Sequence, residues 1–251
     1  MSRWLAEPLR IGLAPGEVAL RLGNTLRVQP ARDDQAASLL PALEQALHEL
    51  PQARTAHVTL SQKLVRHTLT PDPGKSLRRD EEHALARASF ETVYGREAAD
   101  WRIAVHSQPP GAGLFAAAID AGLADALESL LARHGVRRIH IRPLLRDTVH
   151  SLPQRYSGWV ACAEPGWVTL LAATRGTWRH HAVLPCGPDW QRQLPDWLIR
   201  EAVAVAPAPP ATLALRSLGP QPVAPLALTD WKFINLGHTV AATGAAALIA
   251  A

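Results

Sequence analysis

Two stretches of the chain that lie far apart in sequence show the same order of three short strands, and this repeat limits the folds open to the chain. They are LAPGEVALRLGNTLRV (13–28) and WVACAEPGWVTLLAATRGTWRHHAVLP (159–185). In each, an apolar run leads through a Pro-Gly turn into a second apolar run, and a Gly-containing turn leads into a third strand. The segment APGEV (14–18) matches EPGWV (164–168). Such a repeat predicts a fold built from two related halves.

Length and charge bound the class of protein. A chain of 251 residues is long enough for one large domain or two small ones, each with its own core. The net charge is +4, but the basic residues are scattered, and the densest runs are pairs such as Arg78-Arg79 and Arg137-Arg138. No basic stripe interleaved with aromatic residues is present, so nucleic-acid binding is not expected. The excess of Arg keeps a nucleic-acid-binding module as an alternative.

The ends of the chain and its two cysteines favour the cytoplasm. Cys162 and Cys186 lie in apolar surroundings, which is typical of reduced thiols rather than of a disulfide framework. The first ten residues lack the build of a signal peptide, so export is not expected. The apolar run TVAATGAAALIAA (239–251) is shorter than the ~20 residues that span a bilayer. We therefore expect it to form a packed terminal helix.

Hydrophobic spacing predicts alternating strands and helices in the first half. Leucines at helical spacing between Leu39 and Leu50 indicate an amphipathic helix that begins near Asp34. Gly95 and Gly135 are expected to end two further helices, and 71–76 is expected to be a loop. Strands are expected in 9–28, 55–71, 101–106, 114–119 and 136–145.

The second half follows the repeat with one helix and one strand. Residues 188–206 are expected to be helical, with a kink or a new start at Pro195. The run PAPPA (207–211) is typical of a stiff linker, and 212–218 of a last strand. The proline-rich segment 219–238 is expected to be irregular.

This order of elements is similar to that of a duplicated ribonuclease-H-like unit, two of which make the actin-like ATPase fold. The chain resembles the PilM-type proteins of type IV pilus assembly and the cytoplasmic actin-like part of the type II secretion protein GspL. The likeness rests on RIGLAPGEVALRL (10–22), on LFAAAIDAGLADALESLLARHGVRRIHIRPLL (114–145) and on the second repeat with Gly158 before it. It implies an α/β fold with two similar subdomains of mixed sheets, 1–150 and a reduced 151–251.

The resemblance also implies where a nucleotide would bind. Actin-like enzymes carry an acidic residue in the first turn of each meander to hold magnesium, and small residues there that let amides approach phosphates. In the expected register Ala14 and Ala163 take the acidic positions, and a proline removes one amide from each turn. The late glycine-rich turn is reduced to Leu218-Gly219-Pro220. We therefore expect no catalytic residues and no bound cofactor.

An active ATPase or a sugar-kinase relative is the first alternative. Glu17 and Glu164 are the only carboxylates near enough to act as substitutes, although a surface turn is the simpler interpretation of both. If ATP and magnesium were bound, the degenerate site would consist of Gly16, Glu17, Glu164, Gly166 and Gly219.

Other residues that carry chemistry have simpler structural interpretations. His180 and His181 are neighbours on an expected strand, so they should point to opposite faces and not share a metal, and we expect no metal site. Asp120 precedes a helix and is expected to cap it. Five tryptophans are expected to be either core residues or interface anchors, with the last two on one helical face. They are Trp159, Trp167, Trp178, Trp190 and Trp197.

The resemblance implies a function without catalysis. We expect a scaffold of a bacterial type IV pilus or type II secretion assembly platform, cytoplasmic and associated with the inner membrane through its partners. In the resembling families the partner is the short cytoplasmic tail of a membrane protein, or the motor ATPase. A homo-oligomer remains open.

Overall fold

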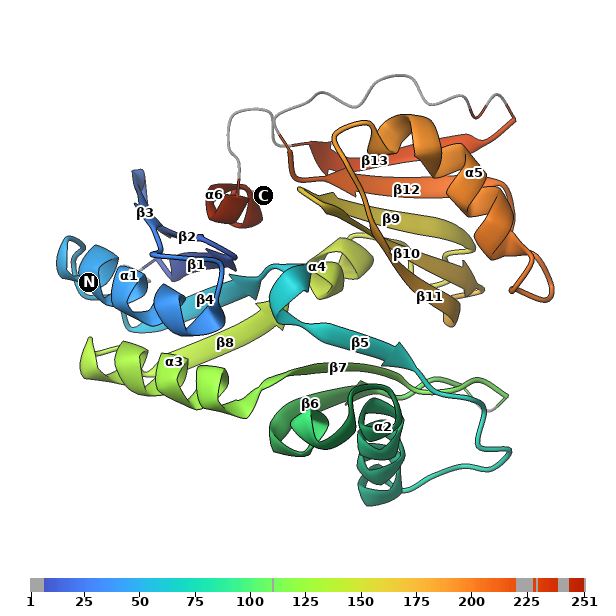
Figure 1. The fold of residues 1–251 in the computed structure, drawn as a ribbon, viewed down its shortest axis with the longest axis horizontal. Coiled ribbons are helices and arrows are strands. Elements are labelled where there is room, and N and C mark those ends of the chain that lie inside the picture. The colour runs from blue at the N-terminus through green and yellow to red at the C-terminus, as the bar shows by residue number, and fades with distance from the viewer. Residues whose placement is uncertain (1–6, 110, 220–227, 229, 239–243, 251) are drawn as a thin grey trace, which may run out of the picture.

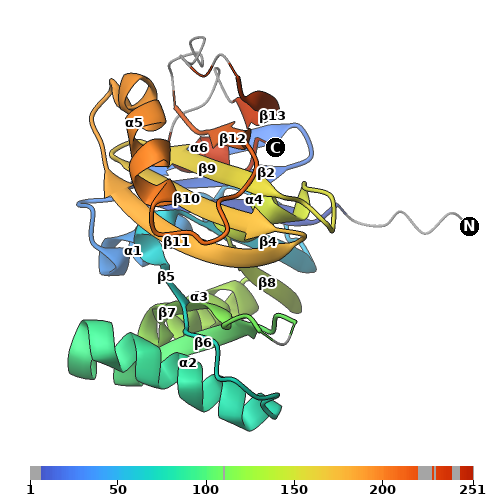
Figure 2. The same ribbon diagram turned by 90° about the vertical axis from the view of Figure 1, so that its right-hand side faces the viewer.

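The fold is built from two five-stranded sheets and one three-stranded sheet, which Figures 1 and 2 show from two sides. The structure is a computed structural model that describes residues 7–109, 111–219, 228, 230–238 and 244–250. Within these residues no helix has the length and apolar character needed to cross a membrane.

The first sheet has the order β3-β2-β1-β4-β8, with β1 antiparallel to β2 and parallel to β4. Alternation along β1 turns Ile11 and Leu13 toward α1 and α3, where they join a buried apolar cluster with Leu43 and Leu131. The elements are β1 (Leu9–Ala14), β2 (Glu17–Leu22), β3 (Thr25–Pro30), α1 (Ala36–His48), β4 (Thr55–Leu60), α3 (Ala121–Arg133) and β8 (Arg138–Pro143).

The second sheet repeats this topology in the order β11-β10-β9-β12-β13. Here β9 is antiparallel to β10 and parallel to β12, as β1 is to β2 and β4. The two related halves predicted from the repeat are therefore confirmed. The elements are β9 (Gly158–Glu164), β10 (Trp167–Thr174), β11 (Thr177–Pro185), α5 (Trp190–Ala202), β12 (Thr212–Ser217) and β13 (Lys232–His238).

The strand β13 corrects the expectation of an irregular segment at 219–238. Residues 220–227 and 229 lie outside the described residues, but 232–238 pair in parallel with β12. The prolines that suggested irregular structure all precede this pairing, and the run KFINLGH contains none. Proline disrupts a strand only at its own position. The prediction of irregular structure was therefore wrong for 232–238.

Two short helices cross between the halves, α4 (Leu144–His150) and α6 (Gly244–Leu248). Helix α4 follows the first sheet and packs on β9 of the second, while α6 comes from the second half and packs on β1 and β2. Both lie between the two large sheets in Figure 1. Their apolar residues, among them Leu144, Ala245 and Ala247, share one buried cluster. The sequence did not predict α4. The terminal helix is confirmed for 244–248, and 239–243 lie outside the described residues.

The third sheet has the order β5-β7-β6 and carries α2 on its outer face. Phe90 on α2 and Ala116 and Ala118 on β7 form its small core. Its strands were predicted, but their separation into a sheet of their own was not. The elements are β5 (Arg66–Leu69), α2 (Arg79–Tyr94), the 3-10 helix η2 (Gly95–Asp100), β6 (Trp101–His106) and β7 (Phe115–Asp120).

Four of the five tryptophans considered above are core residues and not interface anchors. Trp159, Trp178, Trp190 and Trp197 are each at least nine-tenths buried. The last two lie on one face of α5, as predicted, because the helix continues through Pro195. Their main contribution is the apolar area that they bury.

Candidate functional site

The two Pro-Gly turns are equivalent hairpin turns at the ends of β1 and β9. Ala14 pairs with Glu17 across the first turn, and Glu164 pairs with Trp167 across the second. Glu164 is therefore the equivalent of Ala14, which corrects the register that placed Ala163 there. The first turn lacks a carboxylate at this position and the second turn has one. Gly16 and Gly166 have φ values of 75° and 85°, a region that favours glycine.

Glu164 is buried and uses both carboxylate oxygens within the protein. Its Oε2 accepts a hydrogen bond from the Ser61 hydroxyl at 2.6 Å, and its Oε1 accepts one from the Gln62 amide at 2.8 Å. These partners begin the 3-10 helix η1 (Gln62–Leu64) of the first half, so the carboxylate of one half caps a helix of the other. Burial raises the pKa of Glu164, and the two hydrogen bonds oppose this rise. The surface-turn interpretation is wrong for this residue.

Glu17 also caps a helix. Its Oε1 accepts hydrogen bonds from the Ala245 amide at 2.8 Å and the Ala246 amide at 3.4 Å, which are donors at the start of α6. A side chain at Gly244 would lie 2.7 Å from the same oxygen, so glycine lets the helix approach the carboxylate. The Glu17 side chain thus holds the crossing helix against the first turn.

Three of the five candidate nucleotide-site residues line one pocket. Glu164, Gly166 and Gly219 surround a volume of about 300 Å³ together with Cys186 and Trp190. Glu164 is the only charged residue among those that line it, although Lys63 approaches Gly166 from η1. A polyphosphate placed here would meet a carboxylate and no lining Arg or Lys. Gly16 and Glu17 do not line this pocket, and Pro220 lies outside the described residues.

The histidine neighbours of β11 point to opposite faces, as predicted. The Nε2 atom of His180 lies 2.9 Å from a carboxylate oxygen of Glu201, whereas His181 packs near His67 and Phe115. Burial lowers the pKa of His181 to about 4 and that of His67 to about 3. These two rings are therefore neutral near pH 7. Because His180 and His181 point to opposite faces of β11, they cannot hold one metal between them.

A different group of residues has the geometry to hold a metal ion. One ligand atom each from Glu44, His48 and His134 lies within 4.8 Å of the others. The i, i+4 spacing of Glu44 and His48 on α1 was visible in the sequence. His134 lies at the end of α3, and the local sequence did not predict that it would come close to Glu44 and His48. Glu44 already forms an ion pair with Arg133 at 3.5 Å.

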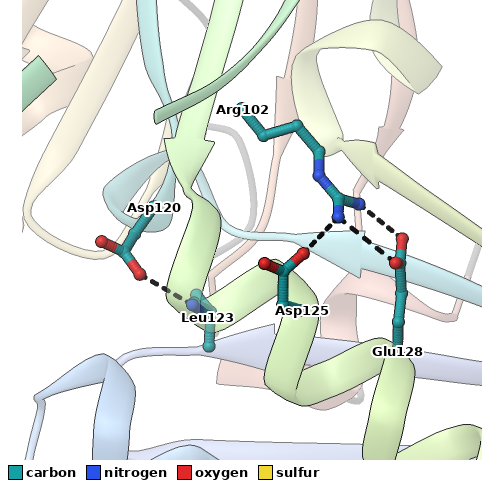
Figure 3. A network of polar contacts seen from close by, with 5 residues as sticks. All are labelled: Arg102, Asp120, Leu123, Asp125 and Glu128. Carbon is teal, nitrogen blue, oxygen red and sulfur yellow. Dashed lines mark hydrogen bonds and ion pairs between the residues drawn. The ribbon is translucent and has the colours of Figure 1, made fainter. Parts of the chain in front are cut away.

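Asp120 caps α3, as predicted. Its Oδ1 accepts a hydrogen bond from the Leu123 amide at 2.7 Å. Figure 3 shows this cap beside Arg102 of β6, which binds Asp125 and Glu128 on α3. These ion pairs tie β6 of the third sheet to α3, which packs on the first sheet.

An apolar groove runs beside these ion pairs, between the first and third sheets. It has a volume of about 250 Å³ and separates β8, an edge strand of the first sheet, from β6, an edge strand of the third. Apolar side chains such as Ile119 and Ile141 line it, and Arg102 and Glu128 supply its charged part.

Comparisons with solved structures agree with this architecture. The cytoplasmic domain of EpsL, an inner membrane component of the type II secretion system of Vibrio cholerae, aligns over 92% of this chain and 90% of its own, with a TM-score of 0.57 and 15% identity. The PilM-PilN type IV pilus biogenesis complex aligns over 92% of this chain and 88% of its own, with a TM-score of 0.57 and 13% identity. The chain has the actin-like fold.

A third structure supports the same fold. A protein of Bacteroides thetaiotaomicron with an actin-like ATPase fold and unknown function covers 93% of both chains, with a TM-score of 0.53 and 11% identity. The sequence matches no family model and no curated protein. The resemblance to the GspL and PilM proteins is thus confirmed at the level of the fold.

Proposed function

We propose that this chain is a non-catalytic actin-like scaffold of a type II secretion or type IV pilus assembly platform, held at the cytoplasmic side of the inner membrane by its partners. The observation that carries the proposal is the use of both turn carboxylates as helix caps. Glu17 and Glu164 already accept two hydrogen bonds each inside the protein. The hydrogen bonds of Glu164 occupy both of its oxygens, so magnesium held there would compete with the cap of η1, whereas both hydrogen bonds of Glu17 go to its Oε1. Among the described residues, no Arg or Lys lines the pocket beside Glu164.

A titration with ATP and magnesium tests the non-catalytic part of the proposal. We expect no saturable heat in calorimetry up to about 1 mM nucleotide and no release of phosphate, because Glu164 and Glu17 are engaged as helix caps. Binding with a Kd tighter than about 10 μM, weakened by a Gly166→Val substitution, would show that the site is intact and would refute this part.

The apolar groove between β8 and β6 is the proposed docking site for the tail of a membrane partner. Two strand edges border the groove, and its floor is apolar, which suits a short extended segment with one or two apolar side chains. The similarity to the PilM-PilN type IV pilus biogenesis complex supports a partner from such a system. The motor ATPase is the second candidate partner, and self-association the third.

A charge placed in the groove should prevent docking. We expect tagged wild-type protein to recover inner-membrane pilus or secretion components from its host, and Ile119→Asp to lose them, because a buried carboxylate would meet the partner's apolar side chains. Val93→Asp is the control, since Val93 is exposed on α2, away from the groove. Circular dichroism melting must show both variants folded. Equal recovery by the folded Ile119→Asp variant would exclude this groove, and recovery of no such component by the wild type would contradict the scaffold function.

A further inference from the structure

A second pocket, of about 320 Å³, lies where the two halves and the crossing helices meet. It shares no lining residue with the pocket beside Glu164. Strands of both large sheets contribute to it, together with α4 and α6. Its charged and titratable residues are Arg10 of β1, His57 of β4, Arg142 of β8, Arg216 of β12 and Asp147 of α4. Among the described residues, three guanidinium groups and one carboxylate line this pocket, so its lining carries more positive than negative charge.

Arg216 is buried without a carboxylate partner in any described contact. Alternation along β12 places Leu213 and Leu215 in the core under α5, and Arg216 on the opposite face, where an apolar residue would be expected. Its side chain is 8% exposed. Its Nη2 donates to the Leu236 carbonyl at 3.3 Å and, more weakly, to the Ser151 hydroxyl at 3.5 Å, and its Nε has no partner. A buried charge with unused donors is costly unless something pairs with it.

Arg142 faces the same pocket from the first half and is also only partly paired. Its Nη1 lies 3.5 Å from the Asp147 carboxylate, and its Nε has no partner. Its Nη2 lies 3.0 Å from Nδ1 of His57. Because a guanidinium can only donate, Nδ1 of His57 must accept and therefore carries no proton. Burial and the positive charges of Arg142, His140 and Arg10 lower the pKa of His57, and Asp147 opposes them. His57 is therefore a neutral ring and does not balance the charge of the guanidinium groups.

We propose that this pocket binds the phosphate group of a small anion, with Arg142 and Arg216 as its ligands. The two guanidinium groups come from different halves and both have a buried Nε donor without a partner. A guanidinium fork matches a phosphate oxygen pair better than a single charge does. A bound phosphate would satisfy both side chains and link β8 of the first half to β12 of the second. This site is independent of the proposed scaffold function.

Inorganic phosphate and pyrophosphate are the probes, added to the full chain at constant ionic strength. We expect saturable binding in calorimetry and a rise in melting temperature that sodium chloride does not reproduce. Arg216→Gln should weaken binding at least 10-fold, about 1.4 kcal/mol. Arg96→Gln, which removes the same charge from an exposed position on η2, should bind as the wild type does.

The melting temperature without phosphate separates a ligand-binding role from a structural one. An unpaired buried charge costs stability, so Arg216→Gln should melt no lower than the wild type in phosphate-free buffer and should lose the rise that phosphate produces. A lower melting temperature of the variant without phosphate, or equal phosphate binding by variant and wild type, would overturn the proposal. Arg216-dependent binding to phosphatidylglycerol vesicles, without binding of free phosphate, would assign the phosphate to a lipid headgroup.

Discussion

At the scale of single residues, Glu164 shows a carboxylate in a hairpin turn that serves the contact between the two halves. It stands at the end of β9 and caps η1 through Ser61 and Gln62. Its equivalent in the first turn is Ala14, which leaves Glu17, on the other side of that turn, to cap α6. The sequence identified both carboxylates. It did not reveal their partners, because these contacts join residues 102 or more positions apart.

The raised pKa of Glu164 predicts a dependence of stability on pH. Burial favours the protonated carboxyl in the folded state, so the contribution of Glu164 to the free energy of unfolding should fall as pH rises from the unfolded value near 4.5 through the folded pKa. A pKa that is higher by one in the folded state corresponds to a fall of about 1.4 kcal/mol. Glu164→Gln should remove this fall in urea denaturation between pH 4.5 and 8, whereas Glu91→Gln, at an exposed position of α2, should keep it. A parallel decline in Glu164→Gln would assign the effect to another group.

At the scale of elements, hydrophobic periodicity predicted the long segments, and tertiary contacts decided the short ones. Regularly spaced leucines predicted α1 and α3 from their own sequences. The repeated apolar runs and Gly-containing turns predicted the hairpins in the same way. Helix α4 has seven residues and α6 has five, too few for a periodic signal, and packing between the sheets makes them helical. Strand β13 likewise depends on its pairing with β12. The proline-rich run before it hid this strand from the sequence prediction.

The approach of α6 to the first sheet depends on Gly12. A Cβ at this position would lie 2.2 Å from the backbone oxygen of Ala245, so Gly12→Ala should force the helix away. Overpacking of this kind costs about 1 to 3 kcal/mol. We expect a lower melting temperature and faster hydrogen exchange of the 245–248 amides. Gly187→Ala is the matched control, since a Cβ there meets nothing within 4 Å. Unchanged exchange in Gly12→Ala would show that α6 docks elsewhere in solution.

At the scale of the whole molecule, the crossing helices, the Glu164 cap, the contact of β5 with β11 and the hydrogen bonds between Gln108 and Trp178 hold the parts together. The predicted division at residue 150 stays a prediction. The strands of the first and third sheets all precede it, and those of the second all follow it. Helix α6 returns across it to the first sheet. Sequence alone could not show this return, because a short apolar helix of Ala and Leu does not specify the sheet on which it packs.

The contact between β5 and β11 should weaken in acid. Burial lowers the pKa of His67 and His181, so below the unfolded value of 6.5 the unfolded chain takes up protons that the folded protein refuses. The free energy of unfolding should therefore fall as pH drops from 6.5 toward 4, by about 1.4 kcal/mol per pH unit for each histidine. Denaturation of a His67→Gln, His181→Gln double variant should show a flatter profile. An identical profile would mean that both rings reach solvent.

The crossing helices also have a mechanical meaning. Because each half buries a helix from the other, pulling the halves apart must extract two apolar segments at the same moment. A load that a docked tail applies beside β8 would pass through α4 into β9 and be shared by both large sheets. In the proposed scaffold function, this packing would carry a force applied to one half into the other.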